Sequence, residues 1–129
     1  MTAAGASGGL DGQPCVLVVD DDPVLRQFVR AVLEGVGYHI EEAASGDEAV
    51  VRIAELTPHV VVLDMMLPGE TGVDVMARLD TSILKILMLT GVDDPDVEMS
   101  AVAAGALAYL TKPFSPRELL DRIESLIAS

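Results

Sequence analysis

Hydrophobic runs and amphipathic segments alternate along the chain from residue 15 onward. Five short runs, four of them strongly apolar, predict strands at 15–20, 38–45, 59–64, 85–90 and 107–112. The second run, "YHIEEAAS", is the more polar one, so we expect it near an edge of the sheet. Between and after these runs, apolar positions recur at helical spacing and predict helices at 23–36, 46–56, 71–79, 95–105 and 115–128.

Local signals mark the ends of several of these helices. Pro23 suits a first helical turn, where its missing N–H costs nothing, and Asp22 before it is a candidate cap. Ser115 with Glu118 three residues later predicts a capping box at the start of the last helix.

Strands that alternate with helices predict an α/β fold, in which a parallel sheet is covered by helices on both faces. The crossover connections should be right-handed. In such sheets a functional site lies beyond the carboxyl ends of the strands, where the strand order reverses. The residues at those ends are therefore the first candidates for chemistry.

Polar side chains follow four of the five predicted strands. The first strand leads into Asp20 and Asp21, the third ends in Asp64, the fourth in Thr90 and the fifth in Lys112. Because all strands of a parallel sheet point the same way, we expect these side chains to converge at one edge. Taken singly, each has a simpler interpretation as a helix cap, a turn residue or a surface lysine. The coincidence of four strand ends favours a common site.

Three carboxylates in one place call for a divalent cation, and the hard ion Mg²⁺ prefers oxygen ligands and leaves room for a phosphate oxygen. A lysine adds a point charge suited to the same phosphate, and a threonine adds a hydroxyl donor. An aspartate in such a site can attack phosphorus and form an acyl phosphate.

Composition and charge narrow the class of protein. The chain has 129 residues, half of them hydrophobic, which predicts one domain at 14–129 after a flexible Gly/Ala/Ser tail at 1–13. A net charge of −13 argues against direct binding of nucleic acid or of an anionic membrane. No apolar run reaches membrane-spanning length, and no secretory signal is predicted. Cys15 is the one cysteine, so an internal disulfide is excluded and a small buried side chain is expected.

With these residues in view, residues 14–128 closely resemble the receiver domains of two-component response regulators. The resemblance is carried by "VLVVDDDPVLR", "HVVVLDMMLPGETG", "ILMLTG" and "AYLTKPF". It implies a flavodoxin-like, doubly wound (βα)5 fold with strand order 2-1-3-4-5. One departure is the segment "LDTSILKI" after the third helix, which is shorter than is usual in the family.

The resemblance also implies roles for individual residues. Asp64 corresponds to the phosphoacceptor, and Asp20 and Asp21 correspond to the acid pair that positions Mg²⁺. The backbone carbonyl of Met66 corresponds to a further metal ligand. Met66 and Val92 occupy positions that tune such sites, and because both are apolar we hypothesise that they hinder an attacking water.

The remaining site residues belong to the switch. Thr90 corresponds to the hydroxyl that moves to bond the phosphoryl group, and Lys112 to the phosphate-binding lysine, followed by a cis bond to Pro113. Tyr109 corresponds to the aromatic residue that turns inward when Thr90 moves. The alternative for Tyr109 is a half-buried strand tyrosine, as expected in the unphosphorylated state.

As a whole, the resemblance implies a cytoplasmic, phosphorylation-dependent switch whose only catalysis is its own phosphotransfer and dephosphorylation. The donor is a phosphohistidine on a sensor histidine kinase or histidine phosphotransfer domain. The surface of the fourth helix, fifth strand and fifth helix then controls a downstream effector protein or fused output domain, or forms a phosphorylation-linked homodimer.

Two alternatives come from other classes. A receiver-like docking module that works without phosphorylation is ranked second, because such modules usually lack part of the acidic site. A phosphatase with an aspartate nucleophile would carry a general acid where this chain has Met66, so that interpretation is weak. His39 and His59 lie in or beside strands and are interpreted as structural, which leaves the phosphodonor to a partner.

Overall fold

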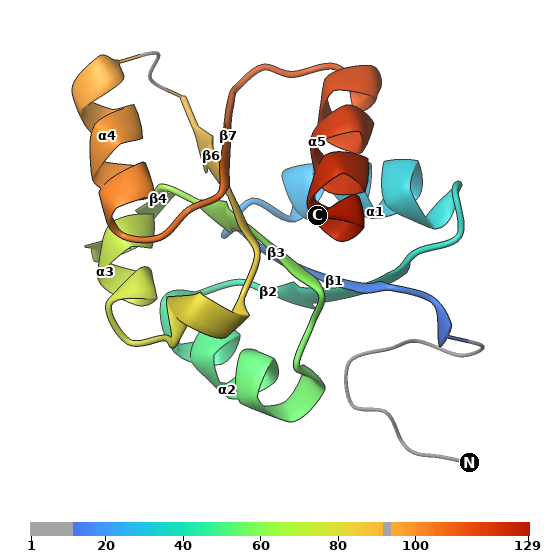
Figure 1. The fold of residues 1–129 in the computed structure, drawn as a ribbon, viewed down its shortest axis with the longest axis horizontal. Coiled ribbons are helices and arrows are strands. Elements are labelled where there is room, and N and C mark those ends of the chain that lie inside the picture. Colours follow the sequence, from blue (N-terminus) through green and yellow to red (C-terminus); the bar gives the residue numbers. More distant parts are fainter. Residues whose placement is uncertain (1–11, 92–93) are drawn as a thin grey trace.

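The computed structural model describes residues 12–91 and 94–129 and has the predicted α/β architecture. Its central parallel sheet has the order β2-β1-β3-β6-β7, which is the predicted order 2-1-3-4-5 when the five strands are counted along the chain (Figure 1). The polar strand β2 lies at an edge, as expected. The strands are β1 (Cys15–Val19), β2 (His39–Ala43), β3 (Val60–Asp64), β6 (Ile86–Thr90) and β7 (Ala108–Thr111).

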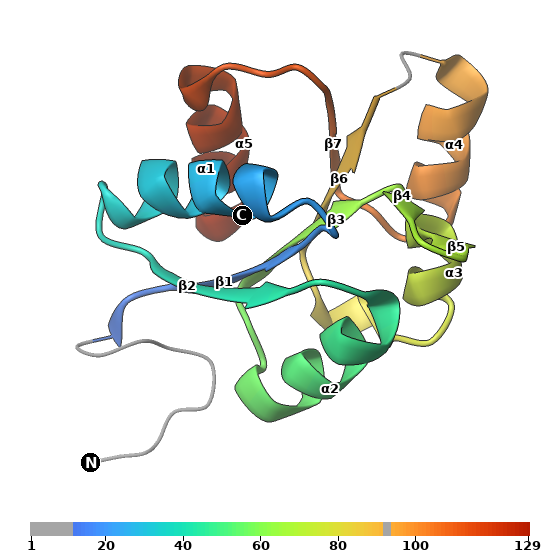
Figure 2. The same cartoon turned by 180° about the vertical axis from the view of Figure 1, so that it is seen from behind.

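Helices cover both faces of this sheet. Helices α1 and α5 pack side by side on one face, and α2, α3 and α4 lie on the other, as both views show (Figures 1 and 2). The helices are α1 (Pro23–Glu34), α2 (Gly46–Leu56), α3 (Gly72–Met76), α4 (Pro95–Ala103) and α5 (Pro116–Ala128).

The central strands are buried on both sides because successive side chains point to opposite faces. In β1, Val16 and Val18 pack toward α1 and α5, whereas Leu17 and Val19 pack toward α2, α3 and α4. This explains why β1, β3 and β6 are continuous apolar runs rather than alternating ones. Cys15 is buried at the start of β1, as predicted.

Capping determines several boundaries. Asp22 accepts a hydrogen bond from the backbone N–H of Val24 at 2.9 Å, and Ser115 and Glu118 form the predicted capping box. Helix α1 ends at Glu34, two residues before the prediction, because the chain turns through Gly37 with φ of +97°. Strands β1, β2, β3, β6 and β7 are each one to three residues shorter than predicted.

The third helix shows the largest difference from the prediction of 71–79. Thr71 is its cap rather than its first residue, and the helix ends at Met76. The backbone N–H groups of Arg78 and Leu79 bond to carbonyls three residues back, so the chain tightens and leaves the α-helical path. A short 3-10 helix, η2 (Thr81–Ile83), follows.

One further element was not predicted. Directly after β3, the strands β4 (Met66–Leu67) and β5 (Glu70–Thr71) form a small antiparallel hairpin. The Lys112–Pro113 bond is cis, as predicted. Most of the predicted tail, residues 1–11, and Val92 lie outside the described residues. Across the described part of the chain, no helix is long and apolar enough to cross a membrane.

Candidate functional site

The carboxyl ends of the sheet strands bring three aspartates together. Asp20 and Asp21 follow β1, Asp64 ends β3, and one carboxylate oxygen from each lies within 4.8 Å of the others. Asp20 is 1 % exposed and Asp64 is 4 % exposed, whereas Asp21 is open to solvent. Two buried carboxylates and one exposed carboxylate thus form an acidic cluster with an open side.

Lys112 pairs with the carboxylates of two of these aspartates. Its Nζ lies 3.1 Å from Oδ2 of Asp64 and 3.3 Å from Oδ2 of Asp20. Its backbone N–H donates to the carbonyl of Thr90 at 2.6 Å, which fixes the start of the β7–α5 connection against β6. Burial works to lower the pKa of the Lys112 ammonium, but the charges of Asp64 and Asp20 outweigh burial and raise that pKa above its ordinary value.

The electrostatics of the cluster are set by burial. The pKa of Asp20 is raised from 3.8 to about 6, mainly because burial penalises the charged form and also because Asp64 lies close by. The backbone N–H of Asp22, 2.9 Å from Oδ1 of Asp20, and the Lys112 ammonium work in the opposite direction. A single ammonium leaves the three carboxylates with excess negative charge. Hard oxygen donors with such an excess fit Mg²⁺.

The chain after Asp64 is held tightly. The backbone N–H of Met66 donates to Oδ1 of Asp64 at 3.1 Å, and the N–H of Gly72 donates to the carbonyl of Met65 at 2.7 Å. The side chain of Met66 points outward and is 63 % exposed, at the first position of the hairpin. The proposed metal-ligand role of the Met66 carbonyl stays a prediction.

The two residues expected to act as a switch occupy neighbouring strands. Thr90 ends β6 and is 1 % exposed, and Tyr109 lies in β7 paired with Met88. Tyr109 is half-buried and packs against the cluster of apolar side chains under α2, α3 and α4. The switch role of Tyr109 stays a prediction.

The remaining titratable candidates lie away from this site. His59, before β3, accepts a hydrogen bond from the backbone N–H of Cys15 through Nδ1 at 3.0 Å, and His39 on the edge strand lies 2.6 Å from Glu41. Burial raises the pKa of the Cys15 thiol to about 11, with Glu41 contributing. These residues are at the amino ends of the strands, opposite to the acidic cluster, in keeping with structural roles.

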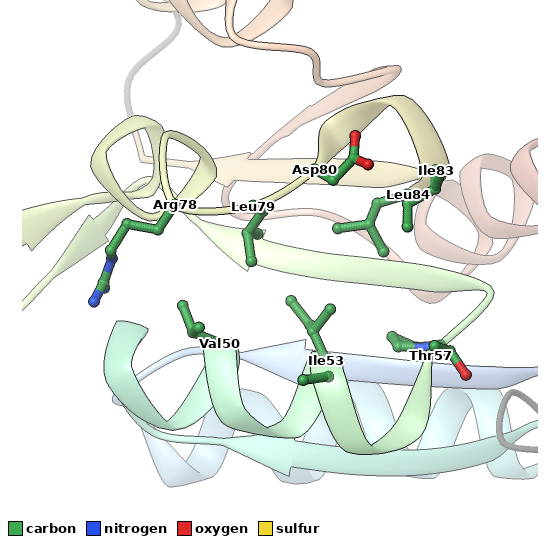
Figure 3. A pocket seen from close by; sticks show the side chains of 10 residues that line it. Val50, Ile53, Thr57, Arg78, Leu79, Asp80, Ile83 and Leu84 are labelled. Atoms are coloured by element: carbon green, nitrogen blue, oxygen red, sulfur yellow. The ribbon is translucent and has the colours of Figure 1, made fainter.

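A separate hollow of about 290 Å³ lies between α2 and the chain after α3, toward the amino ends of β3 and β6 (Figure 3). Its lining is mostly apolar, and its two charged side chains are engaged elsewhere. Arg78 pairs with Asp47 and Glu70, and Asp80 accepts hydrogen bonds from Ser82. The hollow is lined by Val50, Ile53, Ala54, Thr57, Pro58, Arg78, Leu79, Asp80, Ile83 and Leu84.

Sequence reasoning missed one contact of the acidic cluster. Arg26, the last residue of the motif "VLVVDDDPVLR", donates from Nη1 to the backbone carbonyl of Asp20 at 2.6 Å. A signal was present, because an arginine one turn into the helix that follows an acidic loop can reach back over that loop. The spacing alone does not reveal which atom it contacts.

The model of the response regulator receiver domain family matches residues 16–124. The chain is 41 % identical over 120 residues to the probable transcriptional regulatory protein TcrX of Mycobacterium tuberculosis, covering 91 % of this chain and 51 % of that protein. It is 36 % identical over 116 residues to the phosphate regulon transcriptional regulatory protein PhoB of Pseudomonas aeruginosa, covering 87 % of this chain and 51 % of PhoB. The chain thus spans about half the length of these curated relatives.

Solved structures agree with this match. A putative response regulator from Chloroflexus aurantiacus superposes with a TM-score of 0.84 at 37 % identity, covering 91 % of this chain and 99 % of the other. The chemotaxis response regulator CheY4 of Vibrio cholerae superposes with a TM-score of 0.82 at 33 % identity, covering 88 % of this chain and 98 % of CheY4.

Proposed function

Because this chain belongs to the response regulator receiver domain family, whose members are phosphorylation-dependent switches of two-component systems, we propose that Asp64 accepts the phosphoryl group. One observation carries this assignment. The Asp64 carboxylate is nearly buried, yet it shares a cluster with Asp20 and Asp21 and lies 3.1 Å from the Lys112 ammonium. A carboxylate oxygen of Asp64 that attacks phosphorus would lie beside the positive charge of Lys112 and beside carboxylates able to hold a cation, which supports the assignment.

The reaction is a transfer from nitrogen to oxygen. A carboxylate oxygen of Asp64 attacks the phosphorus of a phosphohistidine on a sensor histidine kinase or histidine phosphotransfer domain. A P–O bond forms, the P–N bond breaks, and its electron pair returns to the imidazole of the donor. The product on this chain is an acyl phosphate, whose later hydrolysis returns the carboxylate. Catalysis is limited to this chain's own phosphotransfer and dephosphorylation.

The acidic cluster supports Mg²⁺ as the cofactor. Asp20, Asp21, Asp64 and the carbonyl of Met66 would hold the ion through oxygen atoms. When bound, Mg²⁺ supplies positive charge that lowers the repulsion between the carboxylates and the incoming phosphoryl oxygens. The chain's own residues contribute position: Asp20 is buried and oriented by the N–H of Asp22, and Asp64 by the N–H of Met66.

Lys112 and Thr90 are the donors for the phosphoryl oxygens. Lys112 already contacts Asp64, and Thr90 ends the neighbouring strand β6. Movement of Thr90 toward the phosphoryl group would let the half-buried Tyr109 turn further inward. The arrangements of Thr90 and Tyr109 before and after this movement would differ at the surface of α4, β7 and α5. Phosphorylation of Asp64 would then shift the population from one arrangement to the other.

The surface of α4, β7 and α5 is the proposed output face. Met99 and Val102 of α4 and Leu107 before β7 are exposed at 68 %, 56 % and 60 %. A downstream effector protein, a fused output domain or a second copy of the chain in a phosphorylation-linked homodimer would bind there. The alternative is a docking module that uses this fold without phosphorylation.

Intact-protein mass spectrometry after incubation with acetyl phosphate and Mg²⁺ tests the proposal. We expect one phosphoryl group on the wild type and none on Asp64→Asn or in the absence of metal. Asp121→Asn, an exposed aspartate on α5, is the matched control and should be phosphorylated like the wild type. A wild-type chain that gains no mass and binds neither Mg²⁺ nor beryllofluoride would instead support the docking module.

A further inference from the structure

We propose that Arg26 is a positioning residue for Mg²⁺ binding, which it supports by fixing the backbone of Asp20. The inference rests on the proposed function, since it concerns the same acidic cluster. Nη1 of Arg26 donates to the backbone carbonyl oxygen of Asp20 at 2.6 Å, and only 16 % of the Arg26 side chain is exposed. A hydrogen bond from a charged guanidinium to a backbone carbonyl is strong where solvent is largely excluded.

This contact completes the fixation of Asp20. On the other side of the residue, the N–H of Asp20 donates to the carbonyl of Ala43 on β2 at 3.1 Å. The peptide groups before and after Asp20 are therefore held by β2 and by α1. With both held, the Cα–Cβ bond of Asp20 has a fixed direction, and the N–H of Asp22 and the ammonium of Lys112 then contact the carboxylate. The peptide group that Arg26 holds links Asp20 to Asp21, so the same contact also fixes the backbone at the start of Asp21.

The guanidinium is itself held in place. Nε of Arg26 donates to Oε1 of Glu42 at 2.8 Å, and the other oxygen of Glu42 accepts from Nε of Arg30 at 2.7 Å. Although burial acts to raise the pKa of Glu42, the hydrogen bonds from Arg30 and Arg26 lower it, so Glu42 stays charged. A planar guanidinium can serve Glu42 and the Asp20 carbonyl together, which a lysine ammonium cannot do in the same geometry.

The role of Arg26 is geometric rather than electrostatic. Arg26 contacts the carbonyl of Asp20 and not its carboxylate, whose cation is Lys112. The groups that shift the pKa of the Asp20 carboxyl are its buried surroundings, Asp22, Asp64 and Lys112, and Arg26 is not among them. Residues that orient a metal ligand without contacting the metal themselves typically contribute about 10–100-fold to metal affinity.

Arg30 offers a matched control within the same network. It pairs with the same Glu42 at nearly the same distance and also with Glu34, but no hydrogen bond joins it to Asp20 in the described structure. Replacing either arginine by methionine removes one charge and one partner of Glu42. Only the Arg26 substitution releases the Asp20 carbonyl.

The test is the dissociation constant for Mg²⁺ alone, measured by isothermal titration calorimetry on the wild type, Arg26→Met and Arg30→Met. We expect binding about tenfold weaker in Arg26→Met. Arg30→Met should stay within about twofold of the wild type, because a half-exposed ion pair contributes little. The affinity of Arg26→Lys for Mg²⁺ should lie between those of the wild type and Arg26→Met. If Arg26→Met does not fold, Arg26→Lys is compared with Arg30→Met instead. Equal affinity in the wild type and the Arg26 variants, or equal weakening in the Arg26 and Arg30 variants, would overturn the proposal.

A second readout separates this proposal from the proposed function. In the metal-free protein, amide hydrogen exchange at residues 20–22 should be faster in Arg26→Met than in the wild type and unchanged in Arg30→Met. If the wild type itself does not bind Mg²⁺, the proposed cofactor is wrong, and this exchange still decides whether Arg26 holds the loop. Unchanged exchange in Arg26→Met would overturn the positioning role.

Discussion

Nζ of Lys112 lies 3.1 Å from Oδ2 of Asp64, so the proposed phosphoacceptor is paired with a lysine before any phosphoryl group arrives. The same nitrogen lies 3.3 Å from Oδ2 of Asp20. One ammonium therefore bridges two nearly buried carboxylates from different strands. Its positive charge offsets part of their negative charge, which gives Lys112 a structural role beside its proposed role in phosphate binding.

Replacement of Lys112 by methionine should therefore destabilise the metal-free protein. The nearly buried carboxylates of Asp20 and Asp64 would lose their shared cation. We expect the free energy of unfolding to fall by about 1–2 kcal/mol, and no more, because the ammonium is partly exposed to solvent. Saturating Mg²⁺ should recover most of this loss, because the ion binds only the folded state. Urea unfolding with and without Mg²⁺ measures both effects. A Lys112→Met protein that is as stable as the wild type without metal would contradict the bridging role.

The raised pKa of Asp20 predicts a pH dependence of stability. Its pKa is 3.8 unfolded and about 6 folded, so between these values the folded state binds more protons than the unfolded state. The contribution of Asp20 to the free energy of unfolding therefore decreases as the pH rises through this window, and the full cost of the charge is present above about pH 6.

Asp20→Asn isolates this effect because an amide has a similar shape and no charge. In metal-free buffer the variant should be more stable than the wild type at pH 7, by about 1–3 kcal/mol, and the difference should shrink toward pH 4. Urea titrations at several pH values compare the two proteins. A difference that is constant across this range would mean that the charge of Asp20 is not what costs stability.

Hydrophobic patterning was sufficient to predict the fold class, whereas the strand order came from the family resemblance. The five sheet strands, their order and the edge position of β2 follow from apolar runs that alternate with amphipathic segments, together with the family resemblance. The short α3 was not predicted, because residues 77–79 keep a helical pattern while the backbone tightens into turns. The hairpin β4–β5 was missed because two-residue strands are too short to show any periodicity.

The contacts of the candidate site were likewise predicted only in part. Strand-end positions predicted that Asp20, Asp64 and Lys112 meet, because the carboxyl ends of parallel strands share one edge of the sheet. The position of Arg26, one turn into the helix after the acidic loop, allowed a contact with that loop, but the residue types do not show that the partner is the backbone carbonyl of Asp20. The atom that Arg26 contacts depends on how α1 packs on the sheet.

The exposed side chain of Met66 predicts a slow loss of the phosphoryl group. It stands two residues after Asp64 and cannot orient a water for attack on phosphorus. Met66→Asn introduces an amide that can hydrogen-bond a water, so we expect dephosphorylation to be faster by about tenfold, less than a full general base would supply. Loss of phosphoryl mass after removal of the donor gives the rate.

Met99→Asn is the matched control for this measurement, because Met99 is exposed to a similar extent, at 68 % against 63 %, but lies on α4. Its dephosphorylation rate should equal that of the wild type. If Met66→Asn and the wild type lose the phosphoryl group at equal rates, the apolar side chain at this position does not protect the acyl phosphate.

Gly72 explains how closely α3 approaches Asp64, the proposed phosphoacceptor. A Cβ at Gly72 would lie 2.8 Å from the backbone carbonyl oxygen of Asp64 and 2.8 Å from Sδ of Met88. The methionine can move, but the Asp64 carbonyl belongs to a central strand. Gly72→Ala should therefore reduce the free energy of unfolding by about 1–3 kcal/mol, the usual cost of overpacking, and should also slow phosphorylation by shifting Asp64.

Gly91 provides the comparison for stability, because a Cβ there would meet no atom of the described residues within 4 Å. Gly91→Ala should change the free energy of unfolding by less than about 1 kcal/mol, and in the stabilising direction if the backbone accepts alanine without strain. Thermal unfolding of both variants, with the rate of phosphorylation by acetyl phosphate, tests the argument. If Gly72→Ala were as stable and as readily phosphorylated as the wild type, α3 would have room to move away from β3, and the close approach would not be what holds Asp64 in place.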